Sequence, residues 1–338
     1  MKKYLINGNY LSGNERSREK TKTMRLLITG GLGYIGGRVA AYCKKENPEL
    51  EIILTTRKKR KYFPKWTTGF RVSRLELLDE RSITECIAGS DPDCIIHLAA
   101  VNEIDSEADP DLAREVNFHG TEKLLRAASI KNVKKFIYFS TFHVYGAHNG
   151  RVITEESSVH PKHPYSVTHL AAEKAVKTFN GNGMKTLIFR LSNSYGYPMD
   201  EFINRWTLVV NDLCRQAVVT GRIVLKSSGR QYRDFIALHD VARAVYHFVE
   251  TDIETNELYN LGGESSMTIR EMASAVAETY EKQYGKKIKD FCIGKDTGKD
   301  PKEVIYNIEK LKNTGFILKG NMVNEIEKTL TLCESFVK

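Results

Sequence analysis

The stretch that decides the fold is R-L-L-I-T-G-G-L-G-Y-I-G-G-R-V, residues 25–39. Its first part, Leu26 to Ile28, is a short apolar run typical of a buried strand. Ile35 and Val39 then recur at helical spacing. The glycines between these two patterns therefore lie at a turn that leads from a strand directly into a helix.

Three of these glycines, Gly30, Gly33 and Gly36, have the spacing G-x-x-G-x-x-G. In a strand–turn–helix context this spacing is typical of dinucleotide binding. The first glycine allows the tight turn, the second lets the backbone approach a pyrophosphate, and the third permits close packing of helix on strand. The N–H groups that begin the helix, near Tyr34 and Ile35, face the phosphates. We therefore expect these five residues to bind a dinucleotide.

Downstream, strand and helix patterns alternate. Strands are expected over 52–54, 71–79, 94–100, 134–140 and 186–190, with helices after the glycine turn and over 110–128. This alternation predicts an α/β fold, a Rossmann doubly wound parallel sheet, with a smaller C-terminal α/β substrate lobe. We assign 24–190 to the dinucleotide-binding domain, with 234–262 contributing to it, and 191–335 mainly to the substrate lobe. Residues 1–23 are expected to be a flexible N-terminal extension.

Composition limits the class of protein. The 338 residues are 41% hydrophobic, enough for a globular core, and no apolar run approaches the length of a membrane span. The N-terminus lacks the continuous apolar core of a signal peptide, so we expect a cytoplasmic protein without a membrane partner. The six cysteines are scattered without metal-ligand spacing, which favours reduced thiols and no metal site.

The net charge of +9 is local. Residues 1–25 hold seven Lys or Arg against two Glu, and residues 57–74 hold eight Lys or Arg and no acid, so the remainder is slightly acidic. Part of the second run follows the second expected strand, which ends in Thr55, Thr56, Arg57 and Lys58. An acid at this strand end would bind the ribose 2′-hydroxyl of NAD, whereas Arg57 suits the 2′-phosphate of NADP. The sequence therefore favours NADP over NAD.

Further motifs follow in a fixed order. They are H-L-A-A at 97–100, V-Y-G at 144–146, the P-Y helix from Pro164, R-L-S-N-S-Y-G at 190–196, R-D-F at 233–235, H-D-V-A at 239–242 and Y-N-L-G-G at 259–263. With the glycine turn, they resemble the extended short-chain dehydrogenase/reductase family of nucleotide-sugar epimerases, dehydratases and reductases over about residues 24–335. The resemblance implies that Tyr165 is the acid/base and that Thr141 shares its hydrogen bond to the substrate oxygen. It further places Leu77, Ala99, Ala100 and Asn117 at the cofactor.

One residue departs from the family pattern. The resemblance calls for a lysine four residues after Tyr165, one helical turn on, and this chain has His169 there. A mostly neutral imidazole lowers the pKa of a phenol less than an ammonium does, although it can still donate a hydrogen bond to the cofactor. Three hypotheses follow: an enzyme with an adjusted Tyr165, an enzyme that needs protonated His169, or a protein that binds NADP without turnover.

The substrate side of the site is also given by the resemblance. Dehydratases of the family carry an acid pair where this chain has Phe142 and His143, which argues against 4,6-dehydration. The resemblance implies that Asn193 and Arg233 contact the diphosphate, and His143 is a candidate for orienting a sugar hydroxyl. Arg190, on a strand, is expected instead to form a buried structural ion pair. Residues 202–218 are expected to form a helix.

The sequence thus predicts an NAD(P)-dependent enzyme that transfers a hydride at a carbon, C4, of a nucleoside-diphosphate sugar, as an epimerase or a 4-ketoreductase. The alternative is a non-catalytic NADP-binding sensor or an RNA-associated relative that uses the basic run with Tyr62, Phe63 and Trp66. Because the charge is confined to short segments, we do not expect nucleic acid as the main partner. By resemblance, a homodimer would form through 107–128 and 164–180.

Overall fold

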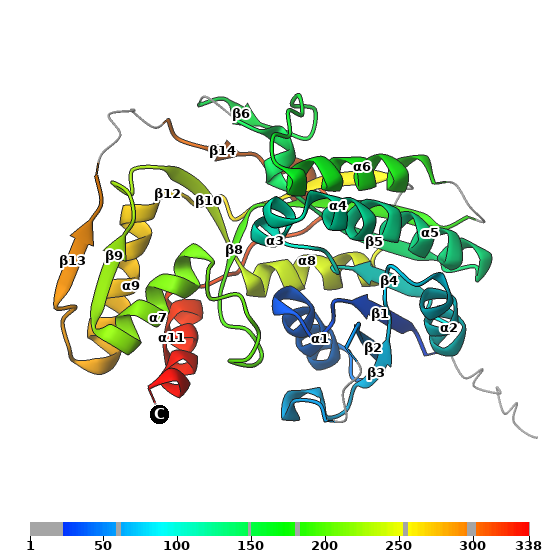
Figure 1. The fold of residues 1–338 in the computed structure, drawn as a ribbon, viewed down its shortest axis with the longest axis horizontal. Helices are drawn as coiled ribbons and strands as arrows, with labels where there is room; N and C mark the ends of the chain where they lie inside the picture. Colours follow the sequence, from blue (N-terminus) through cyan, green and yellow to red (C-terminus); the bar gives the residue numbers. More distant parts are fainter. Residues whose placement is uncertain are drawn as a thin grey trace, which may run out of the picture.

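The computed structural model describes residues 23–58, 62–147, 150–179, 183–252, 256–295 and 302–337. A seven-stranded sheet, parallel throughout, runs through its larger part in the order β3-β2-β1-β4-β5-β7-β11 (Figure 1). The strands are β1 (Arg25–Thr29), β2 (Glu51–Thr56), β3 (Arg71–Arg74), β4 (Cys94–His97), β5 (Lys135–Thr141), β7 (Lys185–Leu191) and β11 (Glu257–Leu261). The order reverses between β1 and β4, which is where doubly wound sheets bind ligands.

Helices cover both faces of this sheet. The helices α1 (Tyr34–Glu46) and α8 (Leu238–Glu250) lie on one face, and α2 (Glu80–Ser90), α5 (Gly120–Ile130) and α6 (Pro164–Thr178) lie on the other (Figure 1). Alternate strand residues serve the two layers: Leu26 and Ile28 pack into the cluster with α1, whereas Leu27 packs into the cluster on the opposite face. The predicted Rossmann fold is confirmed.

The connection from β4 to α5 carries three short helical pieces. These are α3 (Glu103–Ala108), α4 (Pro110–Ala113) and a π-helical segment, Arg114–His119, that leads into α5. The helix predicted over 110–128 is therefore present with a π-helical interruption, and it ends at Ile130. The interruption lies at Asn117, whose side chain has an inward structural role described below.

A third hydrophobic cluster lies apart from the large sheet. It joins α7 (Val209–Thr220), α9 (Ile269–Tyr284) and α11 (Met322–Cys333) to the small sheet β12-β10-β8. The strands of this sheet are Ser266–Thr268, Tyr232–Ala237 and Asn193–Tyr195. The pair of β9 (Arg222–Leu225) with β13 (Asp290–Ile293) belongs to this smaller lobe. The pair of β6 (Val152–Ile153) with β14 (Ile305–Tyr306) and the short α10 (Glu309–Lys312) instead pack into the cluster with α1.

The helix predicted over 202–218 is wrong at its start, because α7 begins only at Val209. The preceding residues instead make turns that are held by local polar groups. The carboxylate of Asp200 accepts from the Phe202 N–H at 2.9 Å, and the Trp206 indole N–H donates to the Glu201 carbonyl at 3.0 Å. Such local hydrogen bonds compete with helical pairing of the backbone.

Several other expectations concern the chain as a whole. The expected extension, 1–23, lies outside the described residues except for its last position. Five cysteines in the described ranges are free and buried, namely Cys43, Cys86, Cys94, Cys214 and Cys333, and burial raises the pKa of each thiol. Within the same ranges, no helix has the length and apolar character needed to cross a membrane.

Candidate active site

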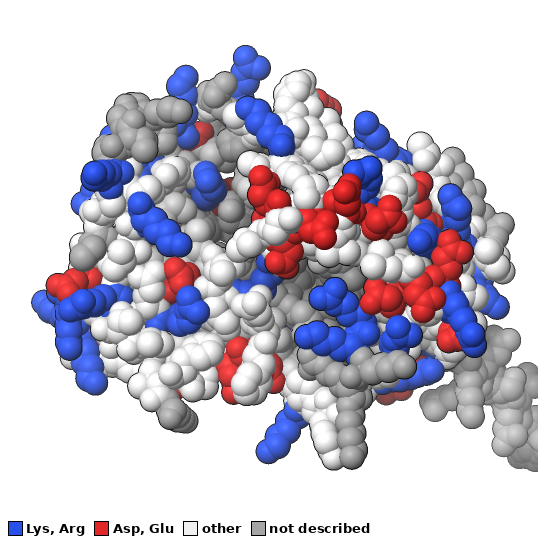
Figure 2. All heavy atoms as spheres, in the orientation of Figure 1, with Lys and Arg blue, Asp and Glu red and all other residues white. Residues whose placement is uncertain are grey.

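A cavity of about 970 Å³ lies at the carboxyl edge of the parallel sheet, between the sheet and the smaller lobe. The space-filling view shows a hollow here, with acidic side chains over α3 and α4 above it and basic side chains below it (Figure 2). The predicted site residues that line the cavity are Gly30, Gly33, Tyr34, Ile35, Gly36, Arg57, Leu77, Ala99, Ala100, Thr141, His143, Tyr165 and Asn193. The predicted residues outside this lining are Asn117, His169 and Arg233.

The glycine turn has the geometry that its spacing predicts. Gly30 has φ of +65°, in the left-handed region that favours glycine. A Cβ atom on Gly36 would lie 2.5 Å from the Gly30 carbonyl oxygen, so only glycine lets α1 pack this closely on the turn. The start of α1 therefore lines the cavity with backbone N–H groups, and the backbone here fits the pyrophosphate of a dinucleotide.

A continuous hydrogen-bond network underlies the cavity floor. The Thr29 hydroxyl accepts from the Leu98 and Ala99 N–H groups at 3.0 and 3.1 Å, and it donates to His97 Nδ1 at 2.6 Å. His97 Nε2 lies 3.0 Å from the Thr121 hydroxyl, which itself donates to the Asn117 carbonyl at 2.7 Å. This pattern requires the neutral Nε2–H tautomer of His97, and burial lowers the pKa of that imidazole to about 3.

Asn117 belongs to this network. Its amide oxygen accepts from the Val101 N–H at 2.7 Å and its amide nitrogen donates to the Thr168 hydroxyl at 3.2 Å. Thr168 in turn donates to the Tyr165 carbonyl at 3.0 Å. Asn117 is 1% exposed, so in this structure it joins the loop after β4 to the helix that carries Tyr165. Contact between Asn117 and the cofactor stays a prediction.

Tyr165 and Thr141 come from different elements but line the same cavity. Thr141 ends β5, and its hydroxyl accepts from the His143 N–H at 3.2 Å, which turns the chain into a short 3-10 helix. Tyr165 lies in the first turn of α6, whose capping box is formed by His163 and Ser166. Burial and the nearby Glu103 raise the pKa of Tyr165, and Arg205 partly offsets this.

His169 lies behind Tyr165 and not in the cavity wall. The two rings meet edge to face with centroids 4.4 Å apart. His169 is 3% exposed, its Nδ1 lies 2.7 Å from the Tyr138 hydroxyl, and burial, followed by His143, lowers the imidazole pKa to about 3. A neutral His169 at pH 7 disfavours the hypothesis that the enzyme needs this residue protonated.

On the substrate side, Asn193 lines the cavity and donates to the Asp234 carbonyl at 3.0 Å. Arg233 instead donates to the carbonyl of Tyr232 at 2.9 Å, and burial lowers its pKa. Within the described ranges no carboxylate pairs with this half-buried cation. The anticipated structural role of Arg190 is confirmed, because Arg190 pairs with buried Glu173 at 2.7 Å.

The cavity residues that the sequence-based prediction did not name include a charged pair, Glu103 and Arg205. Glu103 begins α3 and Arg205 precedes α7, and their side chains pair at 3.6 Å while both line the cavity. No motif marks either of them. The one sequence signal was the run of acids that starts at Glu103, which gives no indication of a partner about a hundred residues away.

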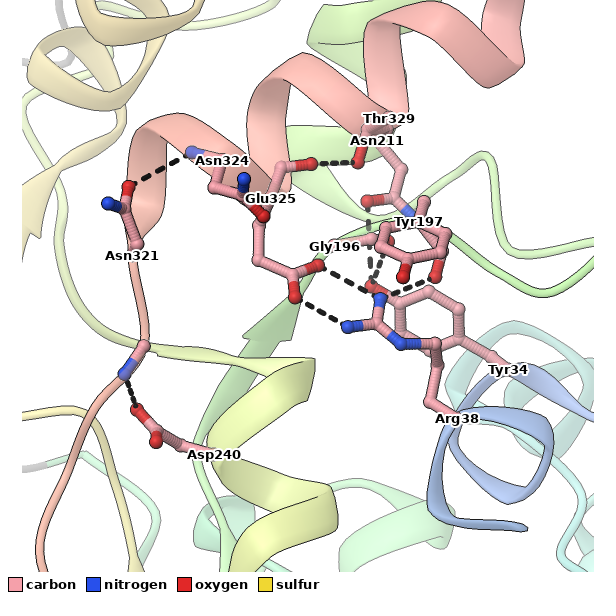
Figure 3. Close-up of polar contacts among 11 residues, drawn as sticks. Tyr34, Arg38, Gly196, Tyr197, Asn211, Asp240, Asn321, Asn324, Glu325 and Thr329 are labelled. Carbon is pink, nitrogen blue, oxygen red and sulfur yellow. Dashed lines mark hydrogen bonds and ion pairs between the residues drawn. The ribbon is translucent and has the colours of Figure 1, made fainter. Parts of the chain in front are cut away.

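A buried clamp holds the smaller lobe to the glycine-turn helix (Figure 3). The Arg38 guanidinium pairs with both carboxylate oxygens of Glu325, at 2.9 and 2.5 Å, and stacks on the Tyr197 ring at 3.8 Å. Tyr34 donates from its hydroxyl to the Gly196 carbonyl at 3.0 Å. The clamp therefore fixes α11 against α1 next to the cavity.

Comparison with known proteins agrees with this geometry. Residues 26–262 match the model of the NAD-dependent epimerase/dehydratase family. The chain belongs to that family. Its homologues are enzymes that act on nucleotide sugars, so this member is an enzyme of the extended short-chain dehydrogenase/reductase group with a nicotinamide dinucleotide as its cofactor.

Three relatives show the range of the family. A UDP-glucose 4-epimerase of Rhizobium meliloti is 26% identical, over 77% of this chain and 83% of its own length. A dTDP-glucose 4,6-dehydratase of Salmonella typhimurium is 27% identical, over 71% and 72%. The structure of a Thermus thermophilus UDP-glucose 4-epimerase with NAD is 26% identical, has a TM-score of 0.76 and covers 92% of this chain and 99% of its own. Since both reaction types occur among the relatives, the argument against dehydration finds no support in them.

Proposed function

We propose that this family member transfers a hydride at C4 of a nucleoside-diphosphate sugar, with Tyr165 as the acid/base and Thr141 as its hydrogen-bonding partner. The observation that carries the proposal is the shared cavity: Tyr165, Thr141 and the glycine turn line one space of about 970 Å³. That volume is at the upper end of the range for ligand sites. A bound nicotinamide dinucleotide supplies the hydride acceptor or donor.

The side chains of this chain divide the remaining tasks. The N–H groups at the start of α1 bind phosphate. Tyr165 takes the proton of the sugar hydroxyl as a phenolate, or returns it as a phenol. Thr141 Oγ1 orients that same oxygen, and the hydroxyl is fixed by its position at the end of β5. Asn193 also lines the cavity, and its side-chain amide suits the diphosphate.

We propose NADP as the favoured cofactor. Thr55, Thr56, Arg57 and Lys58 line the cavity where β2 ends, and Arg57 and Lys58 are exposed there. A guanidinium at this position suits a 2′-phosphate. The test compares the dissociation constants of NADPH and NADH by fluorescence: the native chain should prefer NADPH, and Arg57→Gln should lose about tenfold of that preference, a typical size for one charge-assisted contact. Retention of NAD through purification, detected by mass spectrometry, would overturn it.

The catalytic proposal is tested with Tyr165→Phe, assayed on UDP-glucose and dTDP-glucose with added NADP or NAD. Loss of general acid–base catalysis should lower kcat by about 10²–10⁴-fold while the dinucleotide still binds. Tyr246→Phe on α8, outside the cavity lining, is the matched control and should retain activity. Full activity of Tyr165→Phe would reject the assignment.

A further inference from the structure

The two nitrogen atoms of His169 have different surroundings. Nδ1 lies 2.7 Å from the Tyr138 hydroxyl, whereas Nε2 is buried and has no hydrogen-bond partner among the described residues. If Nδ1–H donated to Tyr138, both the phenol proton and the Nε2 lone pair would lack a partner. If Tyr138 donates to Nδ1, only the Nε2–H group does. Since unpaired buried polar groups are costly, the second arrangement is favoured.

This hydrogen-bond arrangement keeps the His169 imidazole, which lies behind Tyr165, neutral. A neutral imidazole that accepts a hydrogen bond at Nδ1 resists protonation, and burial acts in the same direction. The position one turn after Tyr165 therefore supplies no positive charge near neutral pH. The phenol must lose its proton more readily to act as a base, and a cation elsewhere in the cavity would favour its ionised form.

Charged and titratable groups on several elements share the cavity with Tyr165 or pack behind it. They are Glu103 and Asp105 on α3, Tyr138 on β5, His143 after β5, His169 on α6 and Arg205 before α7. Arg205 is the permanently cationic member of this group. Arg57 and Lys58 also line the cavity, but at its β2 end. The carboxylate of Glu103, 3.6 Å from Arg205, lies between the two lobes and is 44% exposed.

We propose that Arg205 supplies the positive charge that activates Tyr165, that Glu103 opposes it, and that Tyr138 keeps His169 out of this role by holding it as the neutral Nε2–H tautomer. This inference rests on the proposed function, since it takes Tyr165 as the acid/base. Arg205, Glu103 and Tyr138 are positioning residues here, because they act through Tyr165. The chain thus takes the activating charge from the smaller lobe and not from the helix that carries Tyr165.

The electrostatic part is tested by the pH dependence of kcat with saturating dinucleotide and sugar nucleotide. Arg205→Gln should move the limb of the profile that rises with pH to higher pH by about one unit. Glu103→Gln should move the same limb to lower pH by a similar amount, because a nearby charge shifts a pKa by about this much. Arg215→Gln is the matched control. Arg215 pairs with Asp212 at 2.8 Å on α7, outside the cavity lining, and its loss should leave the limb in place.

The dissociation constant of the dinucleotide, measured by fluorescence, separates this effect from weaker cofactor binding, because the proposal expects it to stay within about threefold in both variants. Unshifted limbs in Arg205→Gln and Glu103→Gln, with Tyr165→Phe inactive, would overturn this inference and leave the proposed function intact. An active Tyr165→Phe would overturn both.

The role of Tyr138 is tested without turnover. Long-range ¹H–¹⁵N NMR of the histidine side chains, with His169 assigned from His169→Gln, should show an Nε2–H tautomer that does not titrate between pH 8 and 5.5. Tyr138→Phe removes the donor, and the proposal expects a mixture of tautomers and an imidazole that protonates more readily. An Nδ1–H tautomer in the native chain, or the same tautomer in Tyr138→Phe, would overturn this part.

Discussion

Two Glu–Arg pairs in this molecule have the same chemistry and opposite settings. Glu173 and Arg190 lie beneath the sheet edge with side chains 1% and 4% exposed and a contact of 2.7 Å. Glu103 and Arg205 lie at the cavity with side chains 44% and 29% exposed and a contact of 3.6 Å. The buried pair has no alternative partner in water, whereas the cavity pair can exchange partners with a ligand. The buried pair therefore has a structural role, whereas the cavity pair is available to contact a ligand.

The largest expected effect comes from breaking the buried pair. Glu173→Gln leaves the Arg190 guanidinium buried without its counter-charge, and it replaces one carboxylate oxygen that accepts from Arg190 with an amide NH2 group that cannot. We expect a loss of about 3–5 kcal/mol in the free energy of unfolding, measured by urea denaturation. Glu85→Gln, whose pair with Arg81 lies in solvent, is the control and should change stability by less than about 0.5 kcal/mol. If Glu173→Gln and Glu85→Gln lost the same unfolding free energy, burial would not distinguish the two ion pairs.

The next effect is the pH dependence of stability that follows from burying two neutral histidines. His97 and His169 have pKa values lowered to about 3 in the folded protein, below the unfolded value of about 6.5. The unfolded chain therefore binds more protons between these values. The contribution of the two histidines to the free energy of unfolding is fully present above pH 6.5. It falls as the pH is lowered from about 6.5 toward 3, by about 1.4 kcal/mol per pH unit for each histidine. Urea denaturation from pH 7.5 to 5.5 measures the slope, and His169→Gln should lower it by about half of the two-histidine contribution. An unchanged slope would contradict a neutral buried His169.

The clamp of Figure 3 is an intermediate case between the two pairs. In Glu325→Gln the Arg38 guanidinium loses its carboxylate but keeps the Tyr197 carbonyl at 2.9 Å and the Tyr197 ring. We expect a loss of about 2 kcal/mol, smaller than for Glu173→Gln, because part of the desolvated cation stays satisfied. Calorimetric unfolding ranks the two variants, with Glu327→Gln, a half-buried position on α11 that takes no part in the clamp, as the control. A cost above that of Glu173→Gln would reverse the argument.

The smallest effect on stability is expected at the cavity. Glu103→Gln and Arg205→Gln should each change the free energy of unfolding by less than about 1 kcal/mol, because partly exposed pairs contribute little. A double-mutant cycle on stability should give a coupling energy near zero, while the same variants shift the pH profile in opposite directions. Strong coupling in stability would place this pair with the buried ones.

The sequence predicted the structure most completely at the glycine turn, where the expected function depends on the backbone. The glycine spacing predicts the turn, its positive φ at Gly30 and the close packing at Gly36, because these are constraints among residues that are neighbours in the chain. Strand and helix periodicity predicts the alternation of the sheet. The helix start was misplaced where Asp200 and Trp206 make local hydrogen bonds that hydrophobic periodicity does not reveal.

Several motif residues make hydrogen bonds that stabilise the fold, whether or not they also contact a ligand. Tyr145 of V-Y-G donates to the Asn260 side chain at 2.6 Å, and Asp234 of R-D-F accepts from the Gly263 N–H at 2.9 Å. Asp240 of H-D-V-A accepts from the Lys319 and Gly320 N–H groups. A motif shows that a residue type is required at a position, but it does not show whether the requirement comes from ligand or from packing.

The sequence by itself determined the fold class, the dinucleotide turn, and Tyr165 and Thr141 as candidates, because each depends on short-range spacing or on an ordered set of local motifs. Only the tertiary structure decided that Glu103 meets Arg205, that Asn117 turns inward, and that Tyr138 pairs with a neutral His169. These contacts join segments 16 to about a hundred positions apart in the chain, and the pKa of a group depends on how completely such segments exclude water. Burial and partnership are properties of the packed chain, and no local pattern specifies them.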